Sequence, residues 1–354
     1  MKNRKQIAIA LAGLVVIFSL FLVLRRTPFR ADEPPRPDPP VVRVGWQTVW
    51  ATQGQIIQSM MRTNIPDLYG ARTIFSAYQY GPPLNEAALG DELDCTNSGI
   101  VPTINLISKS EDWIIVGRQV DFLVAIVARK DAGIKTVGDL RGKRIGVPLA
   151  GGSHPYALSR LHDNGLSEGT GPENVEVINL APTEHALALE QGVVDAVAVW
   201  EPTITLLLDK GCTIIDEDHY VGFITVRKSL AETNPEAIVA LLKSYIEANY
   251  FVATHRDLTD KWFAEAAHMN PTLVKRLQVV EPNLKVSEIN QIQIAVDQNR
   301  VAKTQQVADV MYQLKLIKRP LKINERVDQS YLDRALRELS QTGFKTQQIS
   351  ITTN

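Results

Sequence analysis

Short apolar runs recur along this chain and alternate with stretches of helical spacing. The runs are rich in β-branched residues and end at glycine, proline or polar residues, which is typical of strands. One run, FLVAIVA at residues 122–128, is apolar throughout, as expected of a strand buried on both faces. The pattern predicts strands at residues 41–45, 72–80, 93–96, 113–116, 122–128, 144–148, 175–179, 194–199, 212–215 and 222–226. Because helical stretches separate them, we expect a mainly parallel sheet with helices on both faces.

The stretch DLRGKRIGVPLAGGSHPY at residues 139–156 combines a strand, a glycine-rich loop and the start of a helix. Gly151 and Gly152 permit a tight turn and a close approach of the backbone to a ligand. Ser153 is a suitable N-cap for the following helix, and Pro155 suits its first turn. Free N–H groups and the helix dipole favour an anion at such a place. The stretch is therefore either an anion site or an ordinary turn between strand and helix.

The N-terminal segment is the most apolar part of the chain. Residues 7–24 carry no charge and are flanked by basic residues on both sides, which indicates a signal peptide or a membrane anchor. No small-x-small cleavage pattern follows, so we expect residues 1–30 to be an uncleaved signal anchor that leaves the remainder outside the cytoplasm. A cleaved signal peptide is the alternative. Residues 31–40, ADEPPRPDPP, form a stiff proline-rich tether.

Composition and motifs limit the class of protein. The 354 residues suffice for two domains, each with its own core. Lys plus Arg number 38 against 39 Asp plus Glu, so nothing indicates a general affinity for nucleic acid. Cys95 and Cys212 have neither metal-type spacing nor a disulfide framework. The sequence contains no serine–histidine–aspartate order, zinc motif or phosphate-binding loop, and it therefore predicts no enzyme, no metal and no cofactor.

Several segments together resemble the substrate-binding proteins of ABC importers for nitrate, sulfonates and taurine, and the related thiamine-precursor-binding proteins. The segments are VRVGWQ, YGPPLNEAALGDELD, DLRGKRIGVP with a following GS, ALEQGVVDAVAVWEP and FITVRKSL, in this order within residues 41–252. The resemblance implies a type II periplasmic-binding-protein fold, in which two α/β lobes joined by two crossing segments close on a ligand. It also implies an extracytoplasmic receptor that delivers a small polar or anionic compound to an ABC permease and its ATPase. The signal anchor expected from residues 1–30 would tether this receptor to the membrane.

The same resemblance predicts how the chain divides after the tether. We expect residues 41–121 to form the first part of lobe 1, residues 122–227 to form the crossing segments and lobe 2, and residues 228–354 to add C-terminal helices to lobe 1. The runs at 122–129 and 222–227 are the candidate crossings. Two other functions stay open: a pyrimidine or thiamine-precursor binding protein, and a membrane-tethered ligand sensor.

Ligand-binding candidates follow from the family pattern at strand ends and at one helix start. They are Trp46, Gln47 and Thr48 after the first strand, Asn97 and Ser98 after the third, Gly152, Ser153 and His154 at the glycine loop, and Trp200 and Glu201 after residues 194–199. The tryptophans could instead be core residues, Ser153 a helix cap and His154 an exposed histidine. Glu201 could bind a cation of the ligand or form a salt bridge, for which Arg118 and Arg129 are candidate partners.

Overall fold

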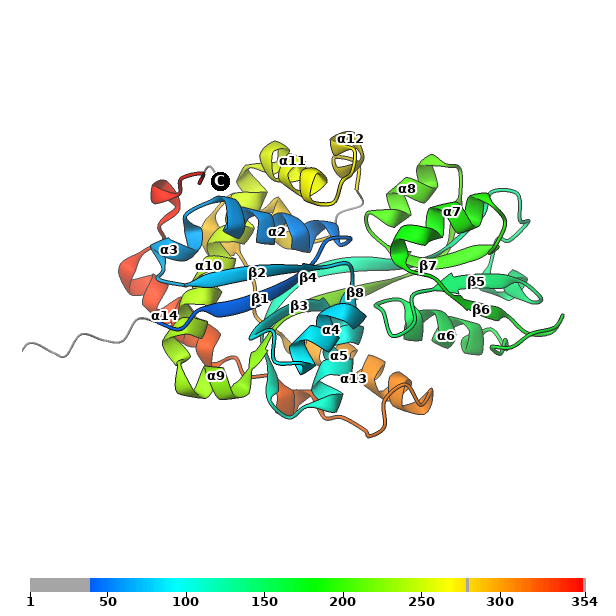
Figure 1. Ribbon diagram of the computed structural model, residues 1–354, viewed down its shortest axis with the longest axis horizontal. Coiled ribbons are helices and arrows are strands. Elements are labelled where there is room, and N and C mark those ends of the chain that lie inside the picture. The colour runs from blue at the N-terminus through cyan, green and yellow to red at the C-terminus, as the bar shows by residue number, and fades with distance from the viewer. Residues whose placement is uncertain (1–38, 278–279, 353–354) are drawn as a thin grey trace, which may run out of the picture. The chain divides into compact units, whose positions relative to one another are not determined.

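The computed structural model describes residues 39–277 and 280–352 of the protein (Figure 1). The predicted signal anchor and most of the tether lie outside these residues. Within the described part of the chain, no helix has both the length and the apolar character needed to cross a membrane.

The strands are β1 (Val42–Gln47), β2 (Thr73–Tyr78), β3 (Cys95–Gly99), β4 (Trp113–Ala128), β5 (Arg144–Val147), β6 (Glu176–Asn179), β7 (Ala196–Trp200) and β8 (Thr213–Arg227). The α-helices are α2 (Ala51–Arg62), α3 (Ile65–Leu68), α4 (Gly81–Leu89), α5 (Ile100–Lys109), α6 (His154–Asp163), α7 (His185–Glu190), α8 (Thr203–Asp209), α9 (Lys228–Thr233), α10 (Pro235–Thr254), α11 (Arg256–Ala266), α12 (Pro271–Val274), α13 (Gln298–Gln313) and α14 (Ser330–Thr342). Short 3₁₀ helices lie at Val137–Leu140, Pro182–Glu184, Pro282–Lys285, Ile289–Gln291, Ile323–Arg326 and Thr346–Gln348.

These strands form one sheet in the order β2-β1-β3-β8-β4-β7-β5-β6. We call β1, β2 and β3 with their connecting helices the first half, and β5, β6 and β7 with theirs the second half. Strands pair in parallel within each half. The central strands β4 and β8 run antiparallel to each other, and β8 also runs antiparallel to β3 and β4 to β7. The sheet is therefore mixed rather than mainly parallel, because the chain returns to the first half through β8.

Two pairs of predicted strands are each one long strand. β4 contains the runs at 113–116 and 122–128, and β8 joins the runs at 212–215 and 222–226. Glycine and arginine at 117 and 118 suggested a strand end, but pairing with β8 continues there through shifts of register. Such a bulge adds residues to one strand without ending the ladder. Both strands consequently reach into both halves of the sheet.

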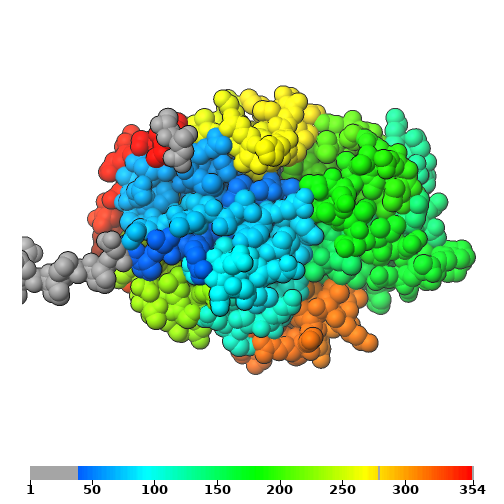
Figure 2. Space-filling view, in the orientation of Figure 1, coloured from blue at the N-terminus to red at the C-terminus, as the bar shows by residue number. Residues whose placement is uncertain are grey.

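The core lies on both faces of the sheet, and helices cover it. Every residue of the predicted apolar run 122–128 is buried in β4, as its composition indicated. In Figure 1, α2 and α11 lie on one face of the first half, and α4 and α5 lie on the other. In the second half, α7 and α8 lie on one face of the sheet and α6 lies on the other. The space-filling view in Figure 2 shows the blue to cyan atoms of the first half in contact with the green atoms of the second.

Candidate ligand site between the two halves

The carboxyl ends of β1 and β3 hold a buried network of amide side chains. Gln47 Nε2 donates to the Asn97 carbonyl at 3.1 Å, and Asn97 Nδ2 donates to the Gly45 carbonyl at 3.1 Å. The Tyr245 hydroxyl of α10 donates to Asn97 Oδ1 at 2.7 Å. Both amide residues are buried. The network joins two strand ends to a helix that lies far along the sequence.

The two hydroxyl residues predicted at these strand ends also bond within the protein. Ser98 Oγ lies 2.9 Å from Thr103 Oγ1 in α5, and Ser98 is fully buried. Thr48 is half-buried, and its hydroxyl lies 3.4 Å from the Tyr78 carbonyl at the end of β2. The structure therefore gathers the first five predicted residues at one edge of the first half, where most of their polar atoms already have partners.

Two buried N–H groups beside this network have no hydrogen-bond partner among the described residues. They are Trp46 Nε1 and Gln53 Nε2, on side chains that are 3% and 0% exposed. Gln53 Oε1 accepts the Gln47 N–H at 2.8 Å, which holds the Gln53 side chain against the end of β1. A buried donor left unpaired costs about 1–3 kcal/mol. Sequence reasoning missed Gln53, whose only signal is a polar residue soon after a strand end.

The glycine loop of the second half departs from the predicted helix cap. The Ser153 hydroxyl donates to the Ala198 carbonyl of β7 at 2.7 Å, and no side chain caps α6. Ser153 does occupy the predicted N-cap position, but the expected capping bond is missing because its backbone is already helical and its buried side chain bonds to the sheet instead. His154 is buried rather than exposed, and its Nδ1 accepts the Ala150 N–H at 3.2 Å. Burial lowers the pKa of His154 to about 4, so its ring is neutral at pH 7.

Trp200 connects the second half to the first. Its Nε1 donates to the Val49 carbonyl, in the loop between β1 and α2, at 3.1 Å. A Cβ added to Gly152 would lie 3.8 Å from the Trp200 ring, so this ring also lies beside the glycine loop. Trp200 is buried, so in this arrangement it is a contact between halves rather than an open wall.

The charged groups expected near Glu201 have other partners. The Glu201 carboxylate accepts the Thr205 N–H at 3.1 Å and the Thr205 hydroxyl at 2.8 Å, in the first turn of α8. Arg118 pairs with Glu281 at 2.5 Å, and both side chains are fully buried. Arg129 Nη2 lies 3.5 Å from Asp195 Oδ1. The structure thus assigns Arg118 and Arg129 to carboxylates other than Glu201.

Aromatic rings occupy the region where β4 and β8 pass between the halves. The ring centroids of Trp50 and Phe122 are 4.8 Å apart, those of Phe122 and Tyr220 6.2 Å, and those of Tyr220 and Tyr156 6.3 Å. A Cβ on Gly222 would lie 2.3 Å from Trp50 Cη2, so a larger residue would displace the tryptophan. The sequence predicted none of these aromatic contacts, because they depend on how the halves meet.

Hydrogen bonds across the junction show that the halves are in contact. Besides the Trp200 contact, Asn105 Nδ2 of α5 donates to the Ala150 carbonyl at 3.3 Å. Gln79 Nε2, after β2, donates to the Thr183 hydroxyl at 3.0 Å. Two α/β halves that share two long central strands and present their strand ends to each other define the periplasmic-binding-protein fold.

Comparisons with known proteins agree with this class. Residues 115–256 match the model of the family described as NMT1/THI5 like. A Bacillus subtilis protein provisionally named an aliphatic sulfonates-binding protein is 29% identical over 283 residues, which cover 77% of this chain and 81% of that protein. The taurine-binding periplasmic protein of Escherichia coli is 27% identical over 51% of this chain and 57% of its own length.

The fold is also that of a solved structure. The crystal structure of the periplasmic aliphatic sulphonate binding protein SsuA of Escherichia coli superposes with a TM-score of 0.66 at 21% identity, over 82% of this chain and 92% of that one. The resemblance inferred from the sequence is thereby confirmed: the chain is a homologue of sulfonate- and taurine-binding proteins. Because these homologues are binding proteins, they also confirm the prediction of a binding protein rather than an enzyme.

Proposed function

We propose that this protein is an extracytoplasmic receptor that binds a small sulfonate-like anion between its two halves and delivers it to an ABC permease. The halves would act as lobes, with β4 and β8 as the two crossing segments. Relatives named as sulfonate- and taurine-binding proteins, one of them described as periplasmic, support the ligand class and the location.

Two donors that have no partner among the described residues carry this proposal, one at the end of β1 and one in the first turn of α2. Trp46 Nε1 and Gln53 Nε2 lie on either side of Val49 in the sequence, and Val49 accepts the bond from Trp200 across the junction. A sulfonate group presents three acceptor oxygens and needs no acceptor in return. In a site shielded from water, neutral N–H groups bind such a group strongly. Arg118 and Arg129 pair with carboxylates of the protein and are therefore not needed as anion ligands.

Closure of the halves would provide the affinity. The bonds from Trp200, Asn105 and Gln79 already hold the two halves together in this arrangement. A ligand that bonds to Trp46 and Gln53 while the second half covers it would stabilise the closed state over an open one. The opposite side of the site would then be formed mainly by the backbone of four residues in the second half: Gly152, Ser153, His154 and Glu201.

The first test is a thermal-shift screen of the purified protein with taurine, alkanesulfonates, nitrate and thiamine pyrimidines. A ligand that binds only the folded state raises the melting temperature, and the stabilisation grows with the logarithm of its concentration relative to the Kd. We expect stabilisation by one class of sulfonate. A shift with pyrimidines alone would replace the sulfonate by the precursor-binding alternative, and no shift with any anion would contradict the proposal.

A matched pair of glutamine variants tests the donors directly. Gln53→Met should weaken sulfonate binding by about tenfold or more, the loss expected for one hydrogen bond to a charged group. Gln55→Met is the control, because Gln55 lies in the same helix, is equally buried, and donates to Asp260. The control should lower the stability of the protein and leave the Kd unchanged in isothermal titration. Equal effects of both variants on the Kd would remove Gln53 from the site.

A further inference from the structure

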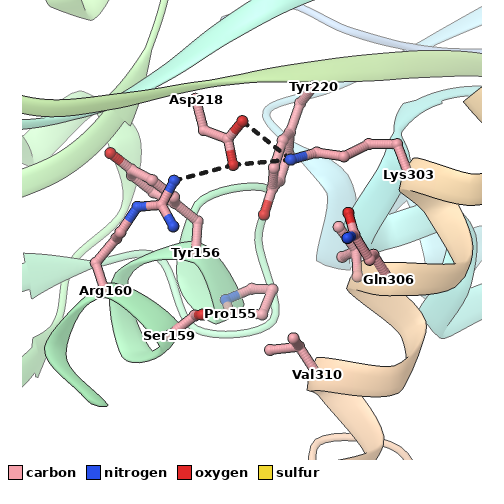
Figure 3. Close-up of a pocket in the computed structure, with 10 residues that line it drawn as sticks. Pro155, Tyr156, Ser159, Arg160, Asp218, Tyr220, Lys303, Gln306 and Val310 are labelled. Atoms are coloured by element: carbon pink, nitrogen blue, oxygen red, sulfur yellow. Dashed lines mark hydrogen bonds and ion pairs between the residues drawn. The ribbon is translucent and has the colours of Figure 1, made fainter. Parts of the chain in front are cut away.

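A pocket of about 260 Å³ lies between α6 and α13, on one face of β8. Figure 3 shows Arg160 on the α6 side, Lys303 on the α13 side and Asp218 above them on β8. The Asp218 carboxylate accepts from Lys303 Nζ at 2.9 Å and 3.0 Å and from Arg160 Nη2 at 3.3 Å. The pocket is separate from the strand ends described above, since none of the predicted ligand residues lines it.

The polar groups that face this pocket are mostly donors. Asp218 is its only lining carboxylate, and both of its oxygens already accept from Lys303. The Tyr220 side chain extends into the pocket in Figure 3, and its hydroxyl forms no hydrogen bond with any described residue. Gln306, at the α13 wall, likewise forms no hydrogen bond within the described part of the chain. An occupant would therefore need acceptor atoms near Lys303, Tyr220 and Gln306.

The remaining wall of the pocket is apolar. Val307 and Val310 of α13 line it together with the Tyr220 ring, and Figure 3 shows Val310 pointing toward the α6 side. Lys303 Nζ lies 5.4 Å from the centroid of the Tyr220 ring, which holds the cation at the edge of this apolar surface. The volume is slightly below the range of about 300–1,000 Å³ that is common for small-molecule sites. It suits a head group with a few carbon atoms.

We propose that this pocket is a second ligand site, which takes a small organic anion with its carboxylate or sulfonate group at Lys303 and Tyr220 and its short apolar body against Val307 and Val310. The pocket has walls from two parts of the fold. Its α6 wall belongs to the second half, and α13 packs against both α6 and α5 of the first half. An occupant would touch elements on both sides of the central strands. This second site does not depend on the proposed function of the first.

Nuclear magnetic resonance on the full chain with labelled valine methyl groups and labelled tryptophan tests both sites in one titration. The probes are butyrate and 1-butanesulfonate, which share a tail and differ in head group. We expect saturable shifts of the Val307 and Val310 methyl signals, and the anion with the lower Kd identifies the preferred head group. The indole N–H signals of Trp46 and Trp200 report on the strand-end site in the same spectra.

Two variants and one control localise the effect. Lys303→Gln should raise the Kd measured at Val310 by about tenfold or more, because a charge-assisted bond is lost and Asp218 loses one of its cations. Val310→Trp should fill the pocket and abolish saturable shifts at Val307. Lys322→Gln is the control, since Lys322 is 76% exposed, pairs with Glu325 and lies outside the pocket. It should leave the Kd unchanged.

The proposal is overturned if neither anion shifts the valine signals, or if Lys303→Gln and Val310→Trp leave the Kd at Val307 unaltered. Shifts of the indole signals without the valine signals would support the strand-end site and reject the second pocket. Valine shifts without indole shifts would support the pocket and count against the first site as an anion site.

Discussion

Arg118, near the middle of β4, and Glu281 form an ion pair that is fully shielded from water. The Glu281 carboxylate accepts Arg118 Nη1 at 2.5 Å and Nη2 at 2.9 Å. It also accepts the backbone N–H groups of Asp121 at 2.6 Å and Asn283 at 2.9 Å. Both charged side chains are 0% exposed. Four donors thus depend on one carboxylate that lies far from Arg118 in the sequence.

Glu281→Ala removes that carboxylate and leaves the guanidinium of Arg118 buried. Arg118 would keep the Gln293 carbonyl, at 3.2 Å from Nε, and the Asp121 carboxylate, at 3.5 Å from Nη1. Removing one partner of a buried pair costs about 3–5 kcal/mol. Because Asp121 compensates part of the charge, we expect a loss of unfolding free energy near the lower end, about 3 kcal/mol.

Equilibrium urea denaturation measures this loss, with Glu265→Ala as the control. Glu265 pairs with Arg62, but these side chains are 45% and 34% exposed, and such a pair contributes about 0–1 kcal/mol. The reasoning fails if Glu281→Ala costs no more than Glu265→Ala at an unchanged m-value. A change in the m-value would instead mean that the variant alters the surface exposed on unfolding.

Two further predictions concern the junction of the halves. Because burial lowers the pKa of His154 to about 4, while a histidine in the unfolded chain titrates at about 6.5, the unfolded state binds more protons between these values. Stability should therefore be full above about pH 6.5 and fall as the pH decreases toward 4. His154→Gln should reduce this pH dependence of the melting temperature. It should not abolish it, because burial also lowers the pKa of His185 to about 4. An unaltered pH dependence would contradict the lowered pKa of His154. Gly222→Ala places a Cβ 2.3 Å from Trp50 Cη2 and should cost about 1–3 kcal/mol through overpacking. Gly138→Ala, whose Cβ would meet only Thr136 Oγ1 at 3.6 Å, should have little effect; equal melting temperatures for the two variants would show that the Trp50 contact is not tight.

Local pattern was sufficient for many elements of this fold. The run 122–128 is buried along its whole length because every side chain in it is apolar. The helices expected after residue 228 include α10, which begins at Pro235. Gln47 and Asn97, predicted just after two strands, lie near the carboxyl ends of β1 and β3, inside the strands themselves. Each of these features depends only on residues close in sequence, within about one or two helical turns or along one alternating strand.

Features that join distant segments did not follow from the pattern. Ser153 has the composition of a helix cap, yet its hydroxyl bonds to Ala198 because β7 lies beside it in the sheet. Arg118 was a candidate partner of Glu201, yet it pairs with a carboxylate 163 positions along the chain. The choice among several acceptors for one donor depends on which of them folding brings within about 3 Å.

The amino-acid sequence alone thus establishes the alternation of strands and helices, the family resemblance and the strand ends where ligand candidates lie. Tertiary structure decides which polar atoms at those ends stay unpaired. Gln47 donates to the Asn97 carbonyl, and the Asn97 side chain accepts from Tyr245. Trp46 and Gln53, in contrast, each keep a donor that has no partner within the described part of the chain. Sequence cannot separate these cases, because a side chain has the same donors and acceptors wherever it lies, and only the packed neighbours determine which of them are satisfied.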